Sequence, residues 1–108
     1  MSDDIETSVE TLHALLRNGG DVQLVDVRDD WELAVASLPG ALHIPLPRLP
    51  NALDALDPAR PVMLLCHHGL RSLQAAIWLR QQGYASATSV AGGIDAWSRL
   101  IDPTVPTY

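Results

Sequence analysis

Short apolar runs and stretches of helical spacing alternate along the 108 residues of the chain. Four apolar runs have the length and composition of buried strands: 22–27, 41–44, 62–65 and 87–90. Apolar spacing, capping residues and prolines predict five helices between and after them: 9–18, 29–37, 47–56, 72–82 and 94–101. Strands that alternate with helices indicate an α/β fold class, in which a mostly parallel sheet carries helices on both faces.

The two ends of the chain lack this pattern. Residues 1–7 are mostly polar and acidic, and residues 102–108 contain two prolines, so we expect both ends to be extended or partly flexible. A chain of this length buries roughly 65% of its extended surface on folding, which is enough for one core and too little for two. The sequence therefore predicts a single domain over residues 1–108.

Charge and hydropathy exclude several classes of partner. Acidic residues outnumber basic ones by 13 to 7, which gives a net charge of −6 without any basic run. Such a chain is a poor partner for nucleic acid or anionic lipid. No apolar stretch approaches the ~18 residues of a membrane span, and the first residues are acidic where a signal peptide would be basic. We therefore expect a cytoplasmic protein with no nucleic-acid partner and no membrane partner.

Two absences restrict the chemistry further. All seven basic residues are arginines, which excludes a Schiff-base lysine and a Walker-type phosphate lysine. Cys66 is the only cysteine, which excludes an internal disulfide, a Cys-x-x-Cys pair and a multi-cysteine zinc site. His67 and His68 are neighbours, whose side chains usually diverge, and no further ligands are evident near them. We therefore expect no metal and no cofactor.

Cys66 directly follows the most apolar run, 62–65, which is predicted to be the central strand. Ligands of parallel sheets bind beyond the carboxyl ends of the strands, so this cysteine stands where chemistry is expected. A tight turn opened by Gly69 would aim backbone N–H groups inward, and a helix N-terminus and the charge of Arg71 add to them. These effects stabilise a thiolate, whereas burial of the sulfur opposes it. An inert, buried cysteine is the alternative reading.

The rest of this loop is the candidate segment for binding substrate and anions: His67, His68, Gly69, Leu70, Arg71 and Ser72. We expect Ser72 to cap the following helix and to have a hydroxyl within reach of the sulfur. Asp26 and Arg28 end the first predicted strand and should support the same rim of the sheet. There we expect Arg28 to pair with Glu32 or Asp29, and Asp26 to accept hydrogen bonds from the loop or from hydroxyl groups.

Four segments together resemble the rhodanese-like sulfurtransferase family, over most of the chain: Val25–Arg28 with Glu32, Leu38–Ala41 leading into Ile44–Pro45, Cys66–Ser72 and Gly92–Trp97. The resemblance implies a single rhodanese domain with a five-stranded sheet. It also implies that Cys66 is the catalytic residue and carries a persulfide. This persulfide would take sulfane sulfur from a small donor, such as thiosulfate or a persulfide, and pass it to a thiol or to cyanide. A sulfur-relay protein is a further partner that the family suggests.

Two details of the loop bear on its substrate. Four residues separate Cys66 from Arg71, whereas the related Cdc25-type phosphatases have five, in a wider cradle that fits phosphate. The best-known thiosulfate-using rhodaneses have basic residues where this chain has His67 and His68, so a protein persulfide is the expected donor. The alternatives are a non-catalytic or redox-regulatory binding module, in which the cysteine cycles through a sulfenic acid, and a phosphatase or arsenate reductase.

Overall fold

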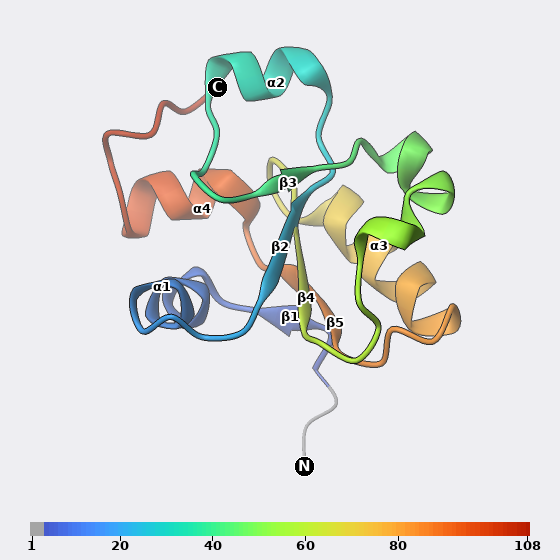
Figure 1. The fold of residues 1–108 in the computed structure, drawn as a ribbon. Coiled ribbons are helices and arrows are strands. Elements are labelled where there is room, and N and C mark those ends of the chain that lie inside the picture. The colour runs from blue at the N-terminus through green and yellow to red at the C-terminus, as the bar shows by residue number, and fades with distance from the viewer. Residues whose placement is uncertain (1–3) are drawn as a thin grey trace.

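A sheet of five parallel strands crosses the centre of the computed structural model, which describes residues 4–108 (Figure 1). The strands stand in the order β1-β5-β4-β2-β3. Their bounds are β1 (Glu6–Thr7), β2 (Gln23–Asp26), β3 (Leu42–His43), β4 (Val62–Leu65) and β5 (Ala87–Val90). All four residues of β4 are buried, because a middle strand of a covered sheet meets side chains on both faces. The predicted α/β class and the central place of 62–65 are therefore confirmed.

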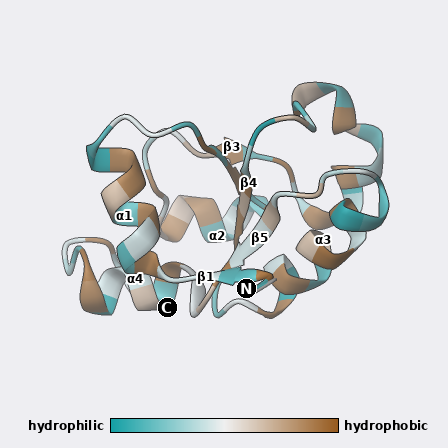
Figure 2. Ribbon diagram, turned by 90° about the horizontal axis from the view of Figure 1, so that it is seen from below, coloured by the Kyte–Doolittle hydropathy of each residue, from teal (hydrophilic) through white to brown (hydrophobic). Residues whose placement is uncertain are grey.

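Helices cover both faces of this sheet. Their bounds are α1 (Val9–Arg17), α2 (Asp30–Val35), α3 (Leu70–Gln81) and α4 (Gly93–Leu100), with two 3₁₀ helices, η1 (Leu46–Asn51) and η2 (Leu53–Ala55). Figure 2 shows α1 and α4 on one side of the sheet and α3 on the other. Successive side chains of β4 point to opposite faces of the sheet, so that Val62 and Leu64 pack on the side of α3. Cys66, which follows the strand, packs on the same side. Within residues 4–108, none of the helices combines the length and the apolar composition of a membrane span.

Two helical segments differ from the pattern-based prediction. The region 47–56 forms two 3₁₀ helices, since Pro47 and Pro50 have no N–H to give to a regular α-helical ladder. Helix α3 begins at Leu70, two residues before the predicted start, and buries a different face from the one that apolar spacing indicates. Its buried residues are Ser72, Ala75, Ala76 and Leu79. The helical spacing of Leu73, Ala76 and Ile77 predicts that these side chains face the core, whereas Ile77 is 45% exposed.

The two ends of the chain also gain contacts that local pattern does not reveal. Residues 1–3 lie outside the described residues, and β1, within the predicted extended end, pairs with β5 through only two residues. The segment after α4 turns at residues 103–105 instead of running extended throughout. It then reaches α2, as Figure 1 shows, and places a half-buried Tyr108 there.

Candidate active site

The sulfur of Cys66 is buried and surrounded by hydrogen-bond donors. The cysteine is 1% exposed, and its Sγ accepts hydrogen bonds from the backbone N–H groups of Gly69, at 3.1 Å, and Ser72, at 3.3 Å. The hydroxyl of Ser72 lies 3.2 Å from the same sulfur. Donors of this kind favour an anionic sulfur over a neutral thiol. The side chain thus combines the burial expected of a core cysteine with the polar surroundings expected of a nucleophile.

The same contacts explain why α3 begins early. Gly69 precedes the helix at a φ of 106°, in the left-handed region that glycine enters without strain. Ser72 is then the third residue of the helix, and its N–H, which has no partner within the helix, donates to the sulfur. Cys66 therefore does at this helix start what a capping oxygen does at others. The prediction that Ser72 caps this helix is therefore wrong, because Gly69 stands at the cap position.

The N-terminus of α4 holds the loop from its other side. The carbonyl of Cys66 accepts from the N–H of Ile94 at 2.8 Å, and the carbonyl of His67 accepts from the N–H of Asp95 at 3.1 Å. With these two carbonyls directed at α4, the loop amides remain free to face the sulfur. Gly93 sits directly against both carbonyl oxygens, with a φ of 61°, and an added Cβ would overlap them. The loop and the start of α4 are therefore one packed unit.

A chain of hydroxyl groups runs from the sulfur into the protein. The Oγ atoms of Ser72 and Ser89 are 2.7 Å apart, and the hydroxyl of Ser89 is 3.3 Å from the carbonyl of Gly69. Each serine has a single proton to donate. With a neutral thiol, Ser89 donates to Gly69 and Ser72 to Ser89. With a thiolate, both protons can turn, so that Ser72 donates to the sulfur and Ser89 to Ser72.

Arg71 is held by an acid from another element. Its guanidinium makes two hydrogen bonds to the carboxylate of Glu32, at 2.6 and 2.8 Å. These bonds lower the pKa of Glu32 to about 2 and raise the pKa of Arg71, to which the nearby Cys66 also contributes electrostatically. The expected pairing of Arg28 with the Glu32 carboxylate is wrong, because Arg71 occupies it. The charge of Arg71 near the sulfur is consequently balanced by a carboxylate.

Asp26 and Arg28 form a buried brace beneath this rim. Arg28 is fully buried, and its Nη2 donates to Asp26 at 2.7 Å and to the carbonyl of Ala36 at 2.8 Å. Its partner is thus Asp26, and neither the carboxylate of Asp29 nor that of Glu32. Two ions taken out of water need several good hydrogen bonds to be tolerated, and this pair has them. The brace fixes the end of β2, from which the chain continues into α2 and Glu32.

His67 and His68 lie together instead of diverging. Their ring centroids are 3.8 Å apart, and the other face of His67 stacks on Tyr108 at 3.8 Å with an angle of 3° between the planes. Ligand atoms of His67, His68 and Asp95 lie within 4.8 Å of one another, so these three residues could hold a metal ion. Such an ion would compete for the carboxylate of Asp95 with Arg99, which donates to it at 2.8 Å. The prediction that the chain binds no metal stays a prediction.

Sequence reasoning missed two members of this cluster and the main contact of a third, Glu32. Ser89 lies inside β5, where its hydroxyl gives no local signal, and Tyr108 lies in a segment predicted to be extended. The sequence names Glu32 as a partner for Arg28, whereas its carboxylate accepts from the N–H of Asp29 at 3.0 Å. Its contact with Arg71, 39 residues away, depends on the fold. Leu70, by contrast, is in the predicted segment but is 69% exposed.

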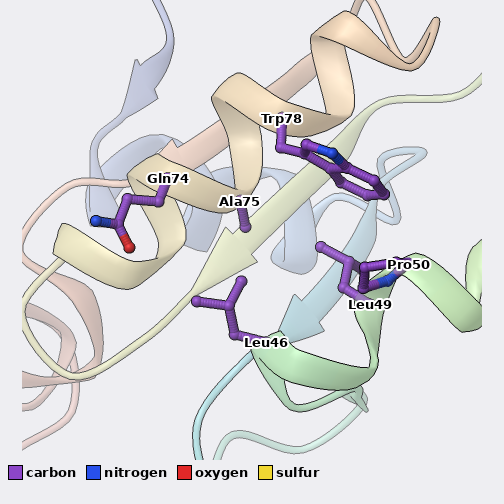
Figure 3. A pocket seen from close by; sticks show the side chains of 6 residues that line it. All are labelled: Leu46, Leu49, Pro50, Gln74, Ala75 and Trp78. Atoms are coloured by element: carbon purple, nitrogen blue, oxygen red, sulfur yellow. The ribbon is translucent and has the colours of Figure 1, made fainter.

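A separate hollow lies between η1 and α3. Its volume is about 170 Å³, and Figure 3 shows the side chains that line it: Leu46, Leu49, Pro50, Gln74, Ala75 and Trp78. None of them belongs to the Cys66 loop. The lining is mostly apolar and none of these six side chains is ionisable, so this hollow supplies no group for acid–base chemistry.

Comparisons with known proteins agree with this architecture. The family model described as the rhodanese-like domain matches residues 8–100. A sulfurtransferase of Allochromatium vinosum is 38% identical over 94 residues, which cover 87% of this chain and 88% of that protein. The solved structure of the human single domain sulfurtransferase TSTD1 is 32% identical with a TM-score of 0.77, over 89% of this chain and 96% of the human chain.

A longer relative shows the same domain within a larger protein. The rhodanese-like/PpiC domain-containing protein 12, chloroplastic, of Arabidopsis thaliana is 38% identical over 110 residues. This match covers 95% of the present chain but only 37% of the length of the plant protein. Since the family model spans most of the chain, and the fold agrees with that of a solved single-domain relative, the chain belongs to the rhodanese-like domain family.

Proposed function

We propose that the protein is a sulfurtransferase that carries sulfane sulfur as a persulfide on Cys66. The observation that supports this most directly is the polar shell of one buried sulfur, in which two N–H groups donate to Sγ and a hydroxyl that can also donate lies beside it, at 3.1 to 3.3 Å. Membership of the rhodanese-like family and the sulfurtransferase names of two relatives point the same way. A single thiol is sufficient, because the persulfide intermediate needs no second cysteine to resolve it.

The reaction has two displacement steps. First, the thiolate of Cys66 attacks the outer sulfur of the donor, and the donor's S–S bond breaks, so that a thiolate or sulfite leaves with the electron pair. Next, a nucleophilic acceptor attacks the terminal sulfur of the Cys–S–S⁻ group, whose S–S bond breaks and returns an electron pair to Cys66. Both states of the enzyme are anionic at sulfur. Fixed amide donors stabilise such anions without reorganising, which is how a preorganised site lowers a barrier.

Mass spectrometry of the intact protein tests the proposal. Incubation with a persulfide donor or with thiosulfate should add the mass of one sulfur atom to the wild-type chain, and cyanide should remove it as thiocyanate. Cys66→Ala should take up no sulfur. Ser98→Ala, which removes a buried hydroxyl bonded to Ile94 within α4, serves as a control that retains the uptake. Turnover that persists in Cys66→Ala, or a wild type that gains no mass from any donor, would reject the assignment.

We further propose that a persulfide is a better donor than thiosulfate. Thiosulfate is a dianion, and Arg71, the cation of the loop, is already paired with Glu32. The net charge of −6 adds a repulsion that salt can screen. We expect a KM for thiosulfate in the millimolar range or above, and a kcat/KM that rises as NaCl is added. An alkyl persulfide, which carries at most one negative charge, should show a much smaller rise when assayed in parallel, and saturation by micromolar thiosulfate would contradict this preference.

A further inference from the structure

Tyr108 joins three parts of the molecule around the Cys66 loop. Its ring stacks on His67 with centroids 3.8 Å apart, and it makes a T-shaped contact with Trp31 on α2 with centroids 5.8 Å apart. Its hydroxyl donates to Oε2 of Glu32 at 2.7 Å and accepts from Nη1 of Arg28 at 2.8 Å. One side chain thus contacts the residue after the nucleophile, the acid that holds Arg71 and the buried brace of β2.

The hydroxyl of Tyr108 completes the shell of donors around the Glu32 carboxylate. Oε1 of Glu32 accepts from Arg71 and from the N–H of Asp29, and Oε2 accepts from Arg71 and from Tyr108. Four donors on two oxygens leave the carboxylate little rotational freedom. Because the guanidinium of Arg71 donates to both oxygens, the orientation of the Glu32 carboxylate sets the position of the guanidinium.

The ring of Tyr108 acts on the loop directly. The backbone carbonyl of His67 is bonded to the N–H of Asp95 at the start of α4, and its imidazole is covered by the ring of Tyr108. His67 is therefore held through its backbone by one element and through its side chain by another. As His67 is the residue bonded to Cys66 in the chain, a change in its position is passed to the nucleophile.

We propose that Tyr108 is a positioning residue of the sulfur-transfer site, which holds His67 and the Glu32–Arg71 pair in place around the Cys66 loop. The inference rests on the proposed function and adds to it a residue that does not touch the reacting sulfur. Burial raises the pKa of Tyr108 to about 12, so that the phenol remains a donor to Glu32 throughout the neutral range. The hydroxyl of Tyr108 binds Glu32 and its ring packs on His67, so these two contacts can be removed separately by substitution.

Two substitutions separate the hydroxyl from the ring. Tyr108→Phe retains the stack on His67 and loses the bonds to Glu32 and Arg28, and we expect kcat for sulfur transfer to fall about tenfold. Tyr108→Leu loses both contacts, and kcat should fall roughly a hundredfold, with KM for a small donor changing much less. The control is Tyr84→Phe, because the hydroxyl of Tyr84 donates to the carbonyl of Leu53 in another part of the molecule. It should leave kcat unchanged.

A second measurement distinguishes positioning from stability and does not depend on sulfur transfer. The rate at which iodoacetamide alkylates Cys66, followed as a function of pH, reports the reactivity of the thiolate in each folded variant. We expect alkylation to be fastest in the wild type, slower in Tyr108→Phe and slowest in Tyr108→Leu. If the variants melt at lower temperature but keep the wild-type kcat and alkylation rate, Tyr108 is a structural residue only and the inference is overturned.

The two proposals fail in different ways. Absence of sulfur uptake by the wild type refutes the sulfurtransferase function, whereas the alkylation rates still decide whether Tyr108 positions the loop. If Tyr108→Leu does not fold, Tyr108→Phe retains the ring and nearly the whole volume of the side chain. A Phe variant with wild-type kcat and alkylation rate then overturns the part of the inference that concerns the hydroxyl, and Tyr108→His, which keeps an aromatic ring, tests the stack.

Discussion

Replacing Gly93 with alanine should lower the free energy of unfolding by about 2–5 kcal/mol. Part of this loss, about 1–2 kcal/mol, comes from placing a Cβ at a φ of 61°. The rest comes from overlap of that Cβ with the carbonyl oxygens of Cys66 and His67, an overpacking that costs about 1–3 kcal/mol where atoms must shift. Because these carbonyls belong to the loop around the nucleophile, the relief of the overlap should displace the amides that face the sulfur.

Urea unfolding of the Gly93→Ala variant checks the loss of stability, and alkylation of Cys66 checks the displacement of the loop. The matched control is Gly19→Ala, since Gly19 has a similar φ of 66° but no heavy atom within 4 Å of the added Cβ. It should cost only the backbone strain and leave Cys66 as reactive as in the wild type. Equal losses of stability in the two variants would show that the loop and the start of α4 accommodate the added Cβ without a further cost in free energy.

Most of the sheet follows from the sequence because its strands are local, apolar and short. Val62–Leu65 needs no partner to be recognised, as four apolar residues between a proline and a glycine-containing loop are typical of a buried parallel strand. Strand β1 has only two residues, and its pairing with β5 joins positions more than 80 residues apart, so no window along the chain reveals it. Strand β4 can therefore be recognised from its own residues, whereas β1 can be recognised only through its distant partner.

The candidate site divides in the same way. The nucleophile, its amide donors and Ser72 lie within seven consecutive residues, and there the sequence predicts the chemistry that the geometry supports. The partners of Arg28 and Arg71 cannot be predicted from the sequence, because each guanidinium can reach several nearby carboxylates and only the fold decides among them. Arg28 turns back to Asp26, two residues earlier, and this leaves Glu32 to Arg71. The contacts of Tyr108 depend on a turn in a segment without periodicity.

The early start of α3 shows how the site alters local structure. Helix-start rules favour a hydroxyl side chain such as that of Ser72 at the cap. The chain instead uses Gly69 in the left-handed region, which turns the N–H groups of Gly69 and Ser72 onto the sulfur. A local rule is thus broken at the position where the donors are needed, as expected of functional sites.

Glu32→Gln should remove about 3 kcal/mol of stability at neutral pH and should flatten the acid limb of the stability profile. The pKa of Glu32 is about 2 in the folded protein because Arg71 bonds to the ionised form, against an ordinary value of 4.5. A depressed carboxyl pKa contributes stability that is fully present above the unfolded value and is lost as the pH falls through the folded one. The gap between these values corresponds to about 3 kcal/mol.

Urea unfolding from pH 7 to pH 2 measures this contribution. The wild type should lose stability between about pH 4.5 and pH 2, and Glu32→Gln should lose about 3 kcal/mol less over the same interval, since its amide does not titrate. Asp54→Asn, which changes an exposed carboxylate, should follow the wild-type profile. Parallel profiles for the wild type and Glu32→Gln would mean that the pair with Arg71 contributes no net stability. Arg71 would then be positioned by the packing of the loop alone.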